Sequence, residues 1–341
     1  MPVHIQVKGV EPNPLDSARV PPMDPGERRS RREAQRAATV RQRRLVALAG
    51  AAAAALLIGA AVGAGGGGDE GGGESRVAAD RPPELPGGGR RLFPDRRVVG
   101  FYGAPQDEEL GELGIGTPAQ AAKRLVRQAR PYTTPKRPVL PTFELLAVVA
   151  AAAPGEGSLY RTRQDDAVIR RYLRAARKAK AMLLLDIQPG RADFLTEAKA
   201  LERWLREPDV SLALDPEWRM DPGEIPGQTI GEVDAAEVNS VSAWLSDLIA
   251  ENDLPEKLLL VHRFTEDMVV NPETLRKPPG VALTLNVDGF GTKAQKLAKY
   301  RVLVPRRFRA GFKLFYREDT GLMSPREVNA LKPLPDVVVY E

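Results

Sequence analysis

Short apolar runs that end on polar or acidic side chains recur along the chain from about residue 96 onward. Runs of β-branched and aliphatic residues this short are typical of strands that are buried on both faces of a parallel sheet. The stretches between them have the apolar spacing of amphipathic helices. We therefore expect eight strands, at 98–103, 139–150, 182–187, 210–214, 257–264, 281–287, 311–316 and 336–340.

Predicted helices alternate with these strands, and the clearest ones lie at 118–130, 165–179, 193–206, 235–251 and 293–300. Such alternation implies parallel strand pairing through right-handed crossovers. Eight repeats in a block of about 246 residues favour a single (β/α)8 TIM-like barrel of the α/β class over an open doubly wound sheet. The turn after the first strand, VVGFYGAPQ, lacks the G-x-G-x-x-G pattern of a dinucleotide-binding fold.

The first 95 residues have no such pattern and divide into three segments. Residues 1–44 are polar and rich in Pro and Arg, which predicts a disordered tail. Residues 45–64 carry no charge, and twenty residues are the length needed to cross a hydrocarbon core of about 30 Å. Residues 65–95 are rich in Gly, with Pro and charges, and are predicted to be a linker. The barrel domain is then 96–341.

A cluster of arginines precedes the apolar segment and predicts its orientation. Residues 28–44 contain eight Arg and one Glu, a local charge of 8 − 1 = +7. Positive charge on the N-terminal flank predicts a single-pass signal anchor with a cytoplasmic N-terminus and an extracytoplasmic C-terminal domain. The alternative is cleavage after Val62–Ala64 and secretion.

Charge and cysteine content argue against a nucleic-acid partner and against sites that require cysteine. The whole chain has a formal charge of +5, so the part outside 28–44 carries 5 − 7 = −2. Without a basic stripe that includes aromatic residues in the folded block, we expect no nucleic-acid partner. The absence of cysteine excludes disulfides and thiolate zinc sites.

Polar residues at the carboxyl ends of the predicted strands are the candidates for a site. In a barrel they project into one cavity, where acids can transfer protons, amides can bind hydroxyl groups and rings can pack on sugar faces. This combination predicts a carbohydrate or cell-wall glycan as partner. The candidates are Tyr102, Glu144, Asp186, Gln188, Asp215, Glu217, Trp218, His262, Asn286, Asp288, Lys313, Tyr316 and Glu341.

The sequence Asp215-Pro-Glu217-Trp218 is the most specific of these elements. Glycoside hydrolysis requires one protonated and one ionised carboxyl group. We assign Glu217 as the acid, with Asp215 or Asp186 as its partner. The stacking surface is assigned to Trp218, Tyr102 and Tyr316, and the remaining candidates to substrate binding.

No cofactor and no metal ligand is assigned from the sequence. One histidine in the folded block, His262, and no cysteine argue against a zinc site. An oxygen-rich Mg²⁺ or Ca²⁺ site built from Asp186, Asp215, Glu217 and Asp288 stays open as an alternative. No G-x-S-x-G motif supports a serine nucleophile.

Several strings give the block Arg96–Glu341 a family resemblance: VVGFYG, LLLDIQPGRADFLTE, LALDPEWR, NVDGFG and GFKLFYREDTGLMSP. In these strings it resembles a family of secreted or membrane-tethered bacterial (β/α)8 proteins without an assigned activity. More distantly, it is similar to glycoside-hydrolase-type TIM barrels. Retaining enzymes of that kind place one Glu after strand four, where Glu217 lies here, and another after strand seven, where this chain offers Glu318 only beyond Tyr316.

The sequence therefore predicts an extracytoplasmic, membrane-anchored, glycoside-hydrolase-like protein. Two alternatives stay open: a non-catalytic module that binds glycan in the same cavity, and a metal-dependent phosphoester hydrolase. The oligomeric state is not predicted.

Overall fold

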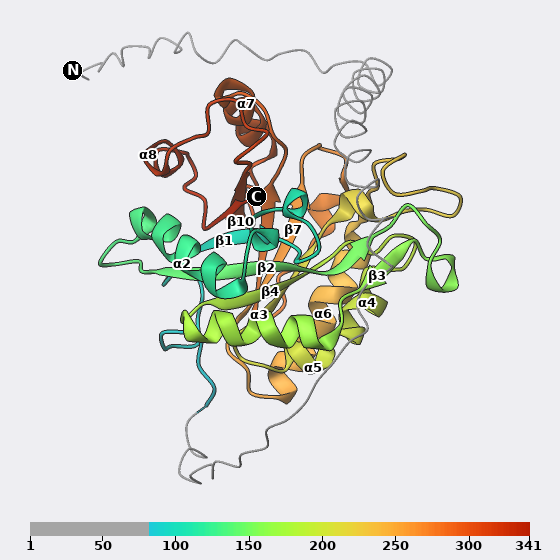
Figure 1. The fold of residues 1–341 in the computed structure, drawn as a ribbon, viewed down its shortest axis with the longest axis horizontal. Helices are drawn as coiled ribbons and strands as arrows, with labels where there is room; N and C mark the ends of the chain where they lie inside the picture. The colour runs from blue at the N-terminus through green and yellow to red at the C-terminus, as the bar shows by residue number, and fades with distance from the viewer. Residues whose placement is uncertain (1–81) are drawn as a thin grey trace, which may run out of the picture.

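The computed structural model describes residues 82–341, which form a closed barrel of eight parallel strands (Figure 1). Strand β1 pairs with both β11 and β2, so the sheet has no free edge in the barrel. The predicted TIM-like α/β fold is confirmed. In chain order the barrel strands are β1 Arg97–Gly103, β2 Val139–Ala150, β4 Met182–Ile187, β5 Val210–Leu214, β7 Lys257–Arg263, β9 Val281–Val287, β10 Arg309–Leu314 and β11 Val337–Tyr340.

The predicted strand bounds agree closely with the observed ones. Strands β2, β4, β5 and β9 begin and end at the predicted residues. Strand β10 begins and ends two residues earlier than predicted. This shift matters for the site, because it leaves Tyr316 beyond the strand.

Helices cover the outside of the barrel (Figure 1). The predicted helix 193–206 is divided at Leu201 into two short helices, and the connection from β7 to β9 contains no α-helix. That connection instead forms β8 Val269–Val270, which pairs with β6 Val233–Asp234. The helices are α2 Pro118–Ala129, α3 Asp166–Lys178, α4 Phe194–Ala200, α5 Glu202–Leu205, α6 Ala235–Glu251, α7 Lys293–Leu303 and α8 Pro325–Asn329.

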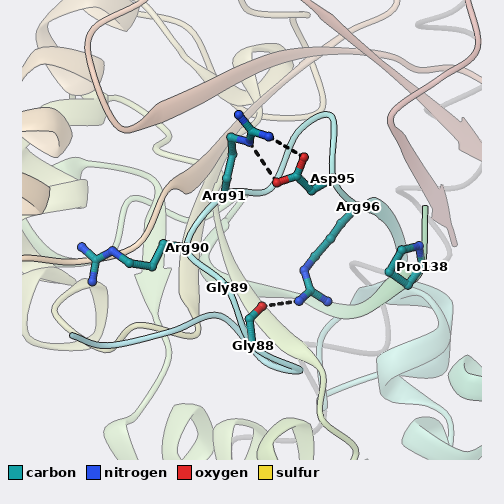
Figure 2. Close-up of a pocket in the computed structure, with 7 residues that line it drawn as sticks. All are labelled: Gly88, Gly89, Arg90, Arg91, Asp95, Arg96 and Pro138. Atoms are coloured by element: carbon teal, nitrogen blue, oxygen red, sulfur yellow. Dashed lines mark hydrogen bonds and ion pairs between the residues drawn. The ribbon is translucent and has the colours of Figure 1, made fainter. Parts of the chain in front are cut away.

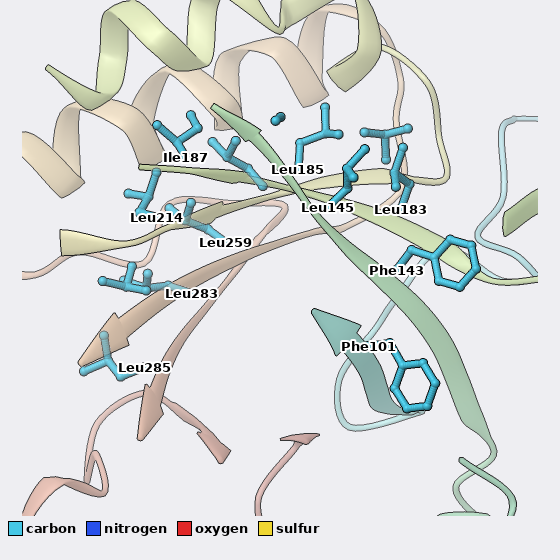
Figure 3. Packing of buried hydrophobic residues seen from close by; sticks show 14 of the residues in the cluster. Phe101, Phe143, Leu145, Leu183, Leu185, Ile187, Leu214, Leu259, Leu283 and Leu285 are labelled. Atoms are coloured by element: carbon cyan, nitrogen blue, oxygen red, sulfur yellow. The ribbon is translucent and has the colours of Figure 1, made fainter. Parts of the chain in front are cut away.

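Alternate strand residues point outward and build the main hydrophobic core against the helices. Phe143, Leu185 and Leu283 are among the buried outward side chains (Figure 3). Helix residues such as Leu173 of α3 and Leu245 of α6 belong to the same cluster. The opposite set of strand residues is directed to the barrel interior, as the two-residue period of a strand requires.

A smaller apolar cluster fills the amino end of the barrel interior and includes residues that precede β1. Leu85, Leu92 and Phe93 are at most 4% exposed and pack with the inward side chains. The carboxylate of Glu256 accepts hydrogen bonds from the backbone N–H groups of Leu92 and Phe93. The folded domain therefore begins before residue 96, because a few apolar residues in the Gly-, Pro- and Arg-rich segment assigned to the linker cap the barrel.

The predicted tail 1–44, the apolar segment 45–64 and the first part of the linker lie outside the described residues. Within residues 82–341, none of the helices combines the length and the apolar character needed to cross a lipid bilayer.

Candidate active site

Each of the eight barrel strands contributes one polar side chain that points inward, toward the carboxyl end of the barrel; Glu144 lies in the middle of the long strand β2, level with Tyr102 of β1. Two of these residues, Asp215 and Glu341, lie one position beyond β5 and β11. All are less than a tenth exposed except Glu341, whose side chain is 24% exposed. We refer to this set as the inner ring: Tyr102, Glu144, Asp186, Asp215, His262, Asn286, Lys313 and Glu341.

His262 lies between two carboxylates in this ring. Its Nε2 is 2.8 Å from Oε1 of Glu144, and its Nδ1 is 3.1 Å from Oδ2 of Asp288. Burial disfavours the charged imidazole, but the two carboxylates outweigh burial and raise the pKa of His262 well above its usual value. The two carboxylates therefore favour the protonated ring, in which each nitrogen can donate to one acid.

Lys313 occupies the other side of the ring. Its Nζ is 2.6 Å from Oε2 of Glu341 and 3.6 Å from Oδ2 of Asp288, and it lies 3.5 Å from the centroid of the Tyr102 ring. Burial favours the neutral amine, but the neighbouring carboxylates raise the pKa of Lys313 above its usual value. The hydroxyl of Tyr102 accepts a hydrogen bond from Nε2 of Gln188 at 3.1 Å.

Asp186 differs from the other acids of the ring. It is fully buried, and neither of its carboxylate oxygens has a hydrogen-bond partner within residues 82–341. Burial, followed by the charge of Asp215, raises the pKa of Asp186 well above its usual value. Oε2 of Glu144 and Oδ1 of Asn286 are also buried without a partner in this part of the chain. Ordinary folding rarely leaves so many polar atoms unsatisfied in one place.

Three of the ring residues have the donor set of a metal site. One ligand atom each of Glu144, Asp186 and His262 can be chosen so that all three lie within 4.8 Å of one another. The sequence-based alternative grouped Asp186 with Asp215, Glu217 and Asp288 instead. The structure groups it with one carboxylate and one imidazole.

Glu217 and Trp218 lie beyond the ring in a short 3-10 turn, Pro216–Trp218, that follows β5. Glu217 is 9% exposed, whereas Trp218 is partly exposed. The carbonyl of Glu217 accepts a hydrogen bond from the backbone N–H of Gly231, which ties the turn to the long loop before β6. These two residues are therefore more exposed than every ring residue except Glu341.

Tyr316 does not join the other predicted site residues. It stacks on Tyr340 with ring centroids 5.2 Å apart and contacts the edge of Phe101, on the outer face of the barrel. The outward side chains Phe312 and Leu314 share its even-numbered parity, whereas Lys313 points inward. The expected role of Tyr316 in a shared cavity is thus not supported by its position.

Two supporting residues were not identified from the sequence. The ammonium group of Lys296 donates to the carbonyls of Gly289 and Lys313, which fixes the loop after β9 to β10. Gly311 lies on the inward face of β10, where an added Cβ would be 2.3 Å from Oδ1 of Asn286. The sequence offered one signal for each residue: Lys296 occupies an apolar position of its helix, and Gly311 lies inside a strand.

A pocket at the opposite end of the barrel is lined by arginines, as Figure 2 shows. It lies beside Arg96 and Pro138, which precede β1 and β2. Arg91 forms two hydrogen bonds with Asp95, and Arg96 donates to the carbonyl of Gly88. These arginines are thus engaged by the chain itself.

No protein-family model and no curated protein sequence matches the chain. Among solved structures, it is similar to a D-allulose 3-epimerase from Methylomonas sp., with 12% sequence identity and a TM-score of 0.33. The match covers 73% of this chain and 86% of the epimerase. At this distance the likeness carries no argument about activity.

Proposed function

We propose that this protein is a barrel enzyme that performs acid–base chemistry on a carbohydrate. The observation that carries the proposal is the inner ring, in which all eight strands direct a polar side chain to the same end of the barrel interior. Burying carboxylates and cations together costs stability that apolar side chains would not cost. Such a ring is better explained by a chemical task than by folding, and the carboxyl end of a (β/α)8 barrel is where catalytic residues occur.

The charge of the site favours a neutral substrate. In and directly beside the ring, carboxyl groups outnumber the cationic side chains His262 and Lys313, even with the nearby Lys296 included. The acids are Glu144, Asp186, Asp215, Asp288 and Glu341. A phosphoester would meet a surplus of negative charge. A sugar is neutral, and its hydroxyl groups can both donate to carboxylates and accept from Lys313 and Gln188.

Glycosidic-bond hydrolysis is the specific reaction that we propose. Glu217 is the candidate acid that protonates the leaving oxygen, and Asp215 is its candidate partner on the water or the anomeric carbon. Trp218 offers an apolar face for the sugar ring at the mouth. Because the ring below is buried, the substrate would enter as a single sugar or a chain end rather than as the middle of a polymer.

An extracytoplasmic location completes the proposal. It is supported by the arginine-rich segment 28–44 directly before the uncharged segment 45–64. Protease treatment of intact cells that produce the full chain would degrade the barrel domain if it faces outward, and would spare it if it faces the cytoplasm.

The activity is tested by incubating the full chain with labelled short glycan fragments and measuring released sugars. We expect Glu217→Gln to lower kcat at least 100-fold with little change in substrate affinity, as the loss of a general acid requires. Glu251→Gln, at the exposed end of α6, is the matched control and should retain full activity.

Other outcomes would identify the competing functions. Glycan binding without any turnover, unaffected by Glu217→Gln, would indicate a non-catalytic binding module. Hydrolysis of phosphoesters that stops when EDTA is added would indicate a metal-dependent phosphoesterase and would refute the argument from charge.

A further inference from the structure

We propose that Glu144, Asp186 and His262 bind one divalent transition-metal ion, of the class represented by Mn²⁺, in the interior of the barrel. This inference deepens the proposed function, since such an ion would hold substrate hydroxyl groups, but its test requires no substrate. It differs from the all-oxygen site considered from the sequence in both its ligands and its metal.

The distances between the donor atoms suit a single ion. Nε2 of His262 and Oε1 of Glu144 are 2.8 Å apart, and the donor atoms of the three residues lie within 4.8 Å of one another. In octahedral coordination with bonds of about 2.1 Å, neighbouring ligand atoms are about 3 Å apart and opposite ones about 4.2 Å apart. Small side-chain adjustments therefore bring all three donor atoms into the first coordination sphere.

The unsatisfied carboxylate oxygens are a second, independent observation. Asp186 is 0% exposed and neither of its oxygens has a hydrogen-bond partner within residues 82–341; the same holds for Oε2 of Glu144. A buried carboxylate without partners is costly, and coordination to a cation is one of the few ways to satisfy it. Asp186 and Glu144 both belong to the group of three.

The surroundings of His262 resemble the second coordination sphere of a metal-bound histidine. Its Nδ1 lies 3.1 Å from Oδ2 of Asp288, so an N–H at this position can donate to the carboxylate and leave the Nε2 lone pair for the ion. The amide of Asn286 is 3.2 Å from the same Nδ1, and a half-turn of the amide would direct its unsatisfied oxygen to that N–H. Carboxylate–histidine pairs of this kind fix the tautomer of a metal-binding imidazole.

The donor chemistry selects the class of ion. One imidazole with two carboxylates suits Mn²⁺ and its first-row neighbours, whereas Mg²⁺ and Ca²⁺ prefer oxygen alone. Three protein ligands leave further coordination positions of an octahedral ion. Two adjacent hydroxyl groups of a sugar can occupy such positions, which would orient the substrate below Glu217 and Trp218.

The test measures the binding of Mn²⁺ to the full chain after removal of metals with EDTA, by titration calorimetry and by the electron paramagnetic resonance signal of free Mn²⁺. We expect one ion per chain, and a loss of affinity of at least about 100-fold in Asp186→Asn and in His262→Gln. Glu341→Gln is the matched control, since it removes one negative charge from the same ring outside the group of three. It should change the affinity less than about fivefold.

Folding of each variant is verified separately, by thermal unfolding with and without Mn²⁺. The ion should raise the Tm of the wild type and of Glu341→Gln but not that of folded Asp186→Asn. Absence of stoichiometric Mn²⁺ binding in the wild type, or equal loss of affinity in Glu341→Gln and Asp186→Asn, would overturn the site. Sugar release that persists in EDTA would refute the role of the ion and leave the hydrolase proposal intact. Mn²⁺ binding without any turnover would support the metal site and refute the hydrolase proposal.

Discussion

Nε2 of His262 lies 2.8 Å from Oε1 of Glu144, although 118 positions separate the two residues and their strands are not neighbours in the sheet. In the order of the barrel, β5 and β4 lie between β7 and β2. The two side chains thus meet across the barrel interior. This contact depends on the curvature of the closed sheet, which brings strands together that are not neighbours.

Asp186→Asn should stabilise the metal-free protein. Asp186 is a fully buried acid beside Asp215 with no hydrogen-bond partner in the described chain, and the amide has nearly the same shape without the charge. We expect the free energy of unfolding in urea, measured with EDTA present, to rise by about 1–2 kcal/mol.

The control for this substitution is Asp209→Asn. Asp209 is also buried, but it accepts two hydrogen bonds from Arg177. That variant should lose stability. If both variants lose stability to the same extent, Asp186 is a structural residue and its buried charge needs no functional explanation.

Gly311→Ala should disturb the site without changing any polar residue. An added Cβ would lie 2.3 Å from Oδ1 and 3.0 Å from Cγ of Asn286, so the amide that contacts His262 must move. We expect a loss of about 1–3 kcal/mol in the free energy of unfolding and weaker Mn²⁺ binding.

Gly100→Ala provides the comparison, because Gly100 is an inward glycine of β1 whose added Cβ would be no closer than 3.4 Å to any neighbour. It should be tolerated in both measurements. Equal behaviour of the two alanine variants would mean that the space beside Asn286 is unimportant.

Lys257 should make stability depend on pH in the alkaline range. Burial lowers the pKa of its amine to about 7, with Asp209 and Glu207 opposing the shift only in part. Between pH 7 and 10.5, the ordinary pKa of a lysine, the unfolded chain binds the proton more tightly than the folded chain, so raising the pH across this window stabilises the folded state.

The measurement compares wild type with Lys257→Met by urea unfolding at about pH 6, about pH 8 and about pH 10. The stability of the wild type relative to the variant should increase from the lowest to the highest pH. A constant difference would show that the amine, whose Nζ donates to the carbonyls of Glu207 and Val210, keeps an ordinary pKa in the folded chain.

Phe93→Ala should destabilise the barrel even though Phe93 precedes its first strand. Phe93 is 4% exposed and packs with the inner apolar cluster, so its truncation should cost about 3–5 kcal/mol in urea unfolding. Leu334→Ala, at a side chain that is 37% exposed, should cost less than about 1 kcal/mol. Similar small effects in both variants would show that residues 82–95 belong to the linker and not to the folded domain.

Much of the barrel could be predicted because strand bounds depend on local pattern. The apolar runs of β4 and β9 are bounded by polar and turn residues, and both strands begin and end where the sequence predicted. Strand β10 was displaced by two residues, since the apolar run 311–316 continues past the last paired residue, Leu314. This shift does not change the face of any side chain. Tyr316 lies three residues after Lys313, so the two-residue period of a strand directs the two side chains to opposite faces, and the prediction that both enter the cavity was wrong for that reason.

The sequence by itself determined which polar residues face the barrel interior, because the two-residue period of a strand places Glu144, Asp186 and His262 on the inward face of their strands. Only the tertiary structure decided their partners. Closure of the sheet places His262 between Glu144 and Asp288 and leaves Asp186 without a hydrogen-bond partner in the described chain. Likewise, the burial of Leu92 and Phe93 follows from contacts with strands distant in the chain, which no local pattern of hydrophobic and polar residues records.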